Sequence, residues 1–222
     1  MSRIPRCRLV EPGSTNHCFW RAHNLSYVLD SDAARLRFLD LIATYKSRFG
    51  ILVHSYCIMG THPHVVCTST LGQPAFSAFW KIVNQRFARW YNRENARRGQ
   101  VVMQRTRSLR IKPTGSHQLT VMRYGDLNPV RAGIVRSPKD WPWSSYRHYA
   151  FGERNDLVDP AQEYLELGRT RVQRRLAYRH LFAQPLSASL RVRRPDLVEG
   201  AFIGDDDWVR ASVSALPRPP PS

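Results

Sequence analysis

Acidic residues are scarce in this sequence. Its 222 residues include 34 Lys and Arg but only 17 Asp and Glu, which leaves a formal charge of +17. An excess of this size points to a polyanionic partner, most often nucleic acid. The alternative is a soluble enzyme that is merely basic. The length and an apolar content of 42% allow one domain with a real core and an appendage.

Cysteine is also sparse, and long apolar runs are missing. The four cysteines form no Cys-x-x-Cys pair and match no common zinc pattern, so we interpret them as reduced thiols. No apolar stretch approaches the ~18 residues of a membrane span, and no signal segment leads the chain. We therefore expect a cytoplasmic, nucleoid-associated protein with no membrane partner. The Gly-x-x-x-x-Gly-Lys-Ser/Thr loop of ATP-binding proteins is absent as well.

Two histidines stand out at the start of a predicted strand. His62 and His64 flank Pro63, and side chains alternate faces along a strand, so both imidazoles point the same way. Such a pair can hold one metal ion. Pro63 cannot donate a ladder hydrogen bond and fits a strand start or edge. A pair of solvent-facing or hydrogen-bonded histidines without a metal is the alternative.

Hydrophobic periodicity and turn residues predict alternating strands and helices. The predicted strands cover 16–22, 51–59, 62–68 and 100–105. The predicted helices run from Asp30-Ser31-Asp32 to Gly50, from Pro74 to about Arg98, and from a Ser116 cap to about Asn128. This order favours an α+β fold of the ferredoxin-like, or RRM-like, plan: one antiparallel sheet with helices packed on one face. We expect a domain over 1–184 with a basic helix at its end, and a weakly packed, Pro-rich tail over 185–222.

A second candidate segment lies in the last predicted helix. Tyr124 and Asn128 are four residues apart and share one helix face, where a phenol and an amide could meet the two histidines. The phenol would be a nucleophile, and the amide oxygen would complete a metal site. The alternative makes Tyr124 a surface residue and Asn128 a cap before Pro129.

Clusters of basic residues provide candidates for binding a nucleic acid backbone. Spacing alone does not separate this role from that of a solvated helix face. The candidates are Arg86, Arg89, Arg93, Arg97, Arg105, Arg107, Arg110, Lys112 and Arg131.

These motifs together resemble a known family. His62-Pro63-His64 resembles the His-hydrophobe-His motif of single-tyrosine HUH nucleases, and the segment 124–133 resembles the Tyr-x-x-x-Asn-Pro-Val-Arg-Ala-Gly block of REP-associated tyrosine transposases. The segments 48–50, 56–59 and 143–146 also match, so the similarity extends from about His17 to Tyr149. Pro63 is an unusual middle residue, and Gly60-Thr61 stands where many relatives have Pro-Asn.

The resemblance implies a mechanism. His62, His64 and Asn128 would bind one Mg²⁺ or Mn²⁺ ion that orients the scissile phosphate. Tyr124 would attack phosphorus and leave a 5′-phosphotyrosine and a free 3′-hydroxyl, so no ATP is needed. The implied substrate is single-stranded DNA, often in hairpin-forming repeats such as REP elements, and a homodimer is possible. The competing hypotheses are a non-catalytic nucleic-acid-binding module with the same fold and a different metal-dependent hydrolase.

Overall fold

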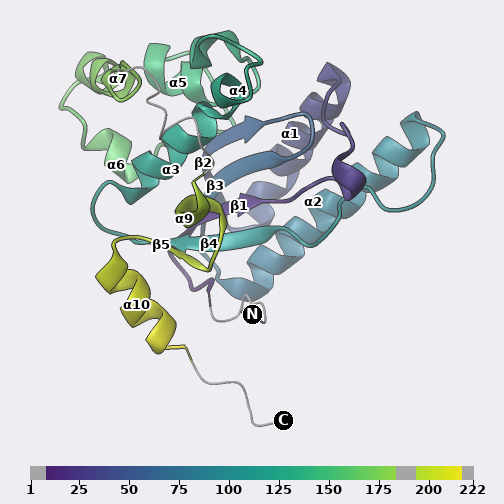
Figure 1. Cartoon of the computed structure of the whole chain (residues 1–222), viewed down its shortest axis with the longest axis horizontal. Coiled ribbons are helices and arrows are strands. Elements are labelled where there is room, and N and C mark those ends of the chain that lie inside the picture. Colours follow the sequence, from purple (N-terminus) through teal and green to yellow (C-terminus); the bar gives the residue numbers. More distant parts are fainter. Residues whose placement is uncertain (1–8, 184–193, 217–222) are drawn as a thin grey trace.

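The computed structural model describes residues 9–183 and 194–216 (Figure 1). Its centre is a five-stranded sheet with the order β2-β3-β1-β4-β5. The strands are β1 (Ser14–Phe19), β2 (Ile51–Ile58), β3 (Pro63–Ser69), β4 (Arg107–Ile111) and β5 (Phe202–Ile203). The first four are joined in antiparallel pairs, whereas β5 runs parallel to β4. The predicted α+β class is confirmed, with a mixed rather than an antiparallel sheet.

Helices cover both faces of the sheet. α1 (Asp32–Lys46) and α2 (Gln73–Glu94) pack on one face, and α3 (His117–Asp126) packs on the other face against β2 and β3 (Figure 1). The prediction of helices on one face was therefore incomplete. The reason is visible in β2 and β3, where nearly every residue is buried, so both faces of these strands need a cover.

Shorter helices complete the described part of the chain, and none of the described helices is long and apolar enough to cross a membrane. They are η2 (His23–Leu25), η3 (Ser47–Phe49), α4 (Asn128–Arg131), η4 (Pro138–Asp140), α5 (Tyr146–Phe151), α6 (Gln162–Leu165), α7 (Arg171–His180), α9 (Pro195–Val198) and α10 (Asp206–Ser214). The helices α4 to α7 gather beside α3 (Figure 1).

The ends of α1 follow the sequence signals. The Ser31 side chain accepts a hydrogen bond from the Ala34 N–H, as an N-cap does. Gly50 has φ +60°, and a Cβ there would lie 2.3 Å from the Thr70 hydroxyl oxygen. Both the conformation and the space therefore require glycine at this stop.

The turn between β2 and β3 is held from outside. The Gly60 carbonyl accepts from the Leu29 N–H at 2.8 Å, and the Thr61 carbonyl accepts from the Ala22 N–H at 2.9 Å. A Cβ on Gly60 would lie 2.9 Å from the Tyr27 ring, so glycine permits this close approach. The turn therefore holds the two histidines that follow it at a defined place.

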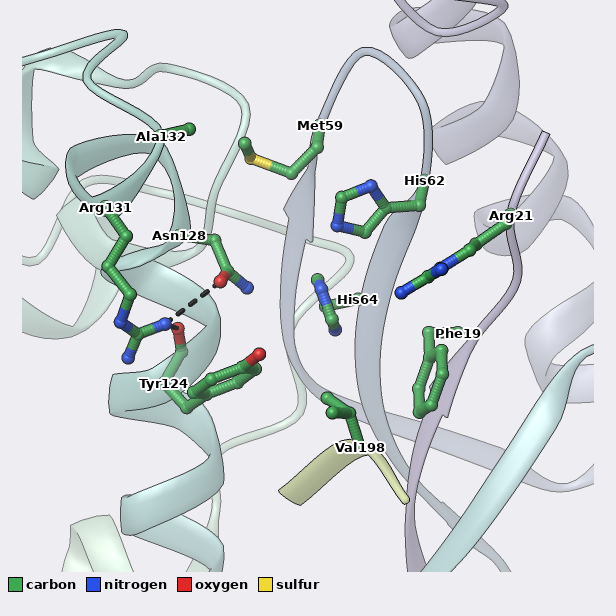
Figure 2. Close-up of a pocket in the computed structure, with 10 residues that line it drawn as sticks. All are labelled: Phe19, Arg21, Met59, His62, His64, Tyr124, Asn128, Arg131, Ala132 and Val198. Atoms are coloured by element: carbon green, nitrogen blue, oxygen red, sulfur yellow. Dashed lines mark hydrogen bonds between the residues drawn. The ribbon is translucent and has the colours of Figure 1, made fainter. Parts of the chain in front are cut away.

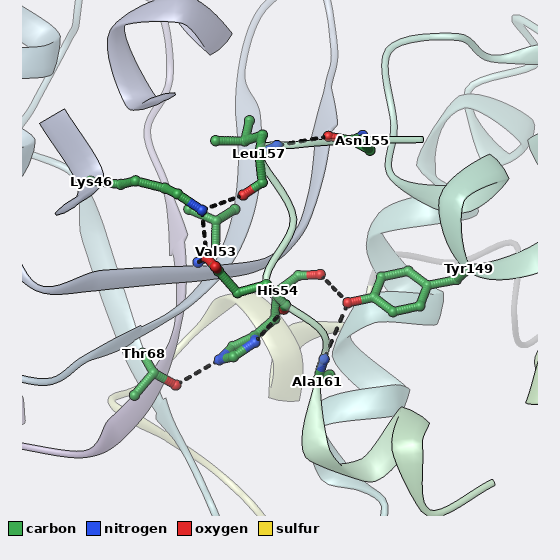
Figure 3. A network of polar contacts seen from close by, with 9 residues as sticks. Lys46, Val53, His54, Thr68, Tyr149, Asn155, Leu157 and Ala161 are labelled. Carbon is green, nitrogen blue, oxygen red and sulfur yellow. Dashed lines mark hydrogen bonds and ion pairs between the residues drawn. The ribbon is translucent and has the colours of Figure 1, made fainter. Parts of the chain in front are cut away.

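The edge strand β2 is covered by the segment 143–161. The Ser145 N–H donates to the Tyr56 carbonyl. The Asp159 carboxylate accepts from the Val53 N–H and from Lys46, in the network of polar contacts around Lys46 and Val53 (Figure 3). At the β-bulge near His54, the Tyr149 hydroxyl donates to the His54 carbonyl at 2.5 Å. These bonds occupy an edge that would otherwise be open to pairing with another chain.

The fourth strand lies later than predicted. The predicted strand at 100–105 is wrong: this segment is a loop with one bridge, between Val102 and Ala22. β4 occupies 107–111 instead, a segment first regarded only as basic. Leu109 and Ile111 alternate with polar residues and are buried, which is enough for a strand when β1 offers a paired edge.

The C-terminal segment is better packed than predicted. In the described range 194–216, α9 and β5 bring Leu197, Val198, Phe202 and Ile203 into the core, each less than a tenth exposed. β5 adds a strand beside β4. The expectation of a weakly packed tail is therefore wrong for this range. The expected boundary at 184/185 and the Pro-rich end lie outside the described residues.

Candidate active site

The two histidines line a cavity of about 290 Å³ on the α3 face of the sheet (Figure 2). His62 immediately precedes β3 and His64 is its second residue, so alternation turns both rings to this face, as predicted. Their ring centroids are 4.9 Å apart. Pro63 begins β3, where its missing N–H costs least.

Tyr124 faces the histidines from α3 on the opposite wall (Figure 2). Its ring centroid lies 5.8 Å from that of His64. Two contacts set α3 close to the sheet at this point. Gly125 faces Cys57, whose Cβ would lie 4.0 Å from a Cβ placed on Gly125, and the Glu163 carboxylate accepts from two N–H groups in the first turn of α3, those of Gln118 and Leu119. The predicted Ser116 cap is wrong, since its side chain makes no capping bond.

Arg131 joins the nucleophile candidate to Asn128. Its guanidinium lies 4.2 Å from the centre of the Tyr124 ring and donates to the Tyr124 carbonyl at 3.0 Å. It also donates to the Asn128 Oδ1 at 3.0 Å. Burial lowers the pKa of Arg131, and the neighbouring Tyr124 opposes this shift. Arg131 therefore contributes a fixed positive charge to the cavity wall.

Asn128 lines the cavity, but its oxygen does not point to the histidines. The oxygen accepts from Arg131, and the amide nitrogen turns towards His64 (Figure 2). This nitrogen is buried and has no hydrogen-bond partner among the described residues. The hydrogen bond to Arg131 fixes which amide atom is oxygen. Asn128 does not cap α4 either, because the N-cap position is Leu127.

Sequence reasoning missed His17, which is fully buried in β1. Its Nε2 lies 2.9 Å from the His64 Nδ1, and its Nδ1 lies 2.8 Å from the Leu197 carbonyl oxygen. Alternation along β1 puts His17 and Phe19 on one face, and this signal was available in the sequence. Arg21, also missed, lines the cavity beside the histidines (Figure 2).

The surroundings keep all three imidazoles neutral near pH 7. Burial lowers the pKa of His17 to about 4. Burial, together with the nearby charge of Arg21, lowers the pKa of His62 to about 4. Burial also lowers the pKa of His64, and the neighbouring His62 and His17 add to this effect. Neutral imidazole is the form that binds a metal.

The donor set fits a single divalent ion only if other ligands join it. His62 and His64 supply two imidazoles, but none of the cavity residues is a carboxylate. Residues 9–183 and 194–216 hold no group of three or more His, Cys, Asp or Glu side chains able to bind a metal. Arg21 and Arg131 add positive charge, which opposes a bare cation. Phosphate and water oxygens would have to supply the remaining ligands and the negative charge.

A search of solved structures returns a REP-associated tyrosine transposase bound to a REP hairpin. The TM-score is 0.56 and the sequence identity 21%, and the match covers 72% of this chain and 94% of that one. The chain has the fold of that transposase. The resemblance drawn from the motifs is thus confirmed for the fold. No known family profile matches the sequence. A search of curated proteins gives no match either.

In this transposase fold, the predicted DNA-binding residues fall into separate groups. Arg86, Arg89 and Arg93 belong to α2, the helix on the sheet face opposite the cavity, and Arg97 follows the end of this helix. Arg107 lies against the cavity residue Phe19, 5.5 Å from its ring centre. Arg110 and Lys112 pair with Glu11 and Asp205, and Arg105 is exposed in the loop before β4. Only Arg107 and Arg131 adjoin the cavity.

Proposed function

We propose that this protein is a metal-dependent, single-stranded DNA endonuclease and strand transferase of the transposase type. One observation supports this most strongly. A tyrosine on α3 faces two neutral imidazoles at the start of β3 across a positively charged cavity, in the fold of a tyrosine transposase. The cavity therefore combines a nucleophile, a pair of metal ligands and cations for phosphate.

Tyr124 is the proposed nucleophile. Its phenolic oxygen gives up a proton and attacks phosphorus, which forms a phosphorus–oxygen bond and breaks the bond to the 3′ oxygen. The 3′ oxygen leaves with a proton as a hydroxyl, and the 5′ phosphate remains on tyrosine. A 3′-hydroxyl can later attack this ester and rejoin the DNA, so no external energy source is required. Arg131, stacked on the ring, holds Tyr124 in place and provides positive charge.

His62 and His64 would hold one Mg²⁺ or Mn²⁺ ion. When bound, the ion polarises a phosphate oxygen as a Lewis acid. Because the cavity offers no carboxylate, the two histidines alone form a weak site for either metal. We propose that the scissile phosphate completes the site, so DNA and metal bind together. The orientation of Asn128 favours a hydrogen bond from its amide nitrogen to phosphate over the predicted role as third ligand.

DNA is the proposed partner, and two features support it. The solved relative is bound to a REP hairpin, and the charge of this chain is +17. Arg21 and Arg107 lie beside Phe19 at the cavity and would follow the sugar–phosphate backbone away from Tyr124. Within residues 9–183 and 194–216, the Arg21 guanidinium has no hydrogen bond or ion pair, so it is available for phosphate.

Covalent trapping tests this proposal. Labelled single-stranded hairpin DNA is incubated with the protein and Mn²⁺, and the products are separated on a denaturing gel. We expect a labelled band linked to protein, which Tyr124→Phe abolishes. Tyr146→Phe is the matched control, because Tyr146 is buried to a similar extent, 5% against 6% exposed. Cleavage without linkage would indicate another hydrolase, and binding without cleavage would indicate a non-catalytic module.

A further inference from the structure

His17 forms a continuous hydrogen-bonded line with the backbone and the candidate metal site. On one side its Nδ1 meets the Leu197 carbonyl oxygen at 2.8 Å, and on the other its Nε2 meets the His64 Nδ1 at 2.9 Å. The three groups come from β1, β3 and the C-terminal helix α9. His17 itself is completely buried, so water cannot substitute for either partner.

The direction of these bonds follows from Leu197. A carbonyl oxygen only accepts, so the His17 Nδ1 must carry the proton and donate it. The Nε2 of a neutral His17 is then an acceptor. The His64 Nδ1 must therefore carry a proton and donate to it. The His64 Nε2 therefore carries no proton, and its lone pair is free on the cavity side. This nitrogen is the atom that a metal would bind.

We propose that His17 is a positioning residue that fixes His64 in the Nδ1–H tautomer, with its Nε2 presented to the cavity. The value of this tautomer for catalysis rests on the proposed function, but its existence does not. His17 is not one of the cavity-lining residues, its ring meets that of Tyr124 only edge-on with centroids 6.3 Å apart, and its hydrogen bonds go to Leu197 and His64, so it acts through His64. His17 lies outside both sequence motifs and is nevertheless part of the site.

A comparison with His62 and His54 shows what is particular about His17. The Nδ1 of His62 lies 2.8 Å from the Thr61 hydroxyl, which either donates or accepts, so Thr61 does not select a tautomer. His54 is linked like His17, with its Nδ1 donating to the Asp159 carbonyl at 2.9 Å (Figure 3). Its Nε2, however, meets the Thr68 hydroxyl at 2.8 Å and leads to no cavity histidine. His54 is thus a matched control.

Nitrogen-15 NMR of the full-length protein, without metal or DNA, tests the proposal directly. Long-range proton–nitrogen correlations of histidine rings distinguish the two tautomers, and His64→Gln identifies the His64 signals. We expect His64 in the Nδ1–H form in the wild type. His17→Phe should shift His64 towards a mixture or the Nε2–H form, because the acceptor is lost. His17→Gln should retain the Nδ1–H form, since its amide offers a donor for Leu197 and an acceptor for His64.

His54→Phe provides the control for loss of a buried imidazole, and we expect the His64 tautomer to remain unchanged there. A second readout is Mn²⁺ affinity in the presence of hairpin DNA, which should fall about 10- to 100-fold in His17→Phe. An Nε2–H form of His64 in the wild type would overturn the proposal, even if His17→Phe fails to fold. So would an unchanged tautomer in folded His17→Phe. A failed trapping experiment with the Nδ1–H form intact would instead refute the proposed function alone.

Discussion

Replacing Asn128 with Asp exchanges one amide nitrogen for an oxygen and tests what this side chain contacts. In the structure the Asn128 oxygen accepts from Arg131 at 3.0 Å, and the buried amide nitrogen has no partner among the described residues. A buried donor without a partner suits an anion, such as a phosphate oxygen. A metal ion would instead require an oxygen on that side. The two roles predict opposite effects of the same substitution.

The magnitude follows from the hydrogen bond at stake. A hydrogen bond to a charged group contributes about 1.5–3 kcal/mol. A change of about 1.4 kcal/mol corresponds to tenfold in Kd. If Asn128 donates to phosphate, Asn128→Asp should weaken binding of hairpin DNA roughly 10- to 100-fold, and repulsion between the carboxylate and phosphate should add to this. If Asn128 is a metal ligand, the carboxylate should bind the hard ion more tightly.

The assay measures DNA affinity without metal by fluorescence anisotropy, and then Mn²⁺ affinity with DNA bound. Arg131 pairs with a carboxylate as well as with an amide oxygen, so Asn128→Asp should preserve the local structure. Asn84→Asp is the control for an added negative charge, because Asn84 lies on α2 and bonds to Thr106. Unchanged DNA affinity together with tighter Mn²⁺ binding in Asn128→Asp would refute the phosphate role and restore the ligand role.

Three further predictions follow from the site and the core. His62→Ala or His64→Ala should remove metal-dependent cleavage with the fold retained, and normal cleavage by either variant, or by wild type with chelator, would contradict the metal site. DNA affinity should fall with salt at a log–log slope near −3.5 if about five phosphates are neutralised, whereas a flat dependence would mean that the charge serves another purpose. Burial raises the pKa of Asp126 from 3.8 to about 8, against the opposing hydrogen bond from Tyr178. Between pH 3.8 and about 8 the folded protein thus keeps a proton on Asp126 that the unfolded chain has lost, so this group lowers the free energy of unfolding by about 1.4 kcal/mol per pH unit as pH rises. The buried histidines, whose pKa values are lowered from 6.5, oppose this fall below pH 6.5, so the slope should be measured between pH 6.5 and 8. Urea unfolding should show this slope disappear in Asp126→Asn, and a persistent slope would assign it to other groups.

Local patterns in the sequence were sufficient for much of the candidate site. The shared face of His62 and His64 needs only strand alternation, and the structure has it. Tyr124 and Asn128 both line the cavity, although α3 ends at Asp126 and Asn128 belongs to α4. Tyr124 and Asn128 still share one face because Leu127, which lies between the two helices, keeps nearly helical dihedral angles. Asn128 is itself helical as the first residue of α4, so Pro129 does not act by disfavouring helical geometry there; it has no N–H to donate to the carbonyl four residues earlier, which fits the break.

Contacts between segments that are far apart in the sequence could not be predicted from local patterns. Glu163 caps α3 from 45 residues away, so the Ser116 signal at the helix start gave the wrong cap. β4 has only a short apolar alternation, and its pairing with β1 decided its position. His17 meets His64 across 47 residues and Leu197 across 180. Hydrophobic periodicity indicates which face of a helix or strand is buried. It does not indicate which polar group of a distant segment contacts that face.

The positions of the charged residues were also beyond what the sequence could predict. A formal charge of +17 predicts a polyanion but not the place where it binds, since every basic residue counts equally in the sum. The structure separates basic residues by their partners. Arg110 and Lys112, both predicted to bind DNA, already contact Glu11 and Asp205. Arg21 was not predicted, yet it lines the cavity without such a partner among the described residues. A cation at the cavity that has no carboxylate partner attracts a phosphate more strongly than several paired cations elsewhere. Its charge is not compensated at the site of reaction.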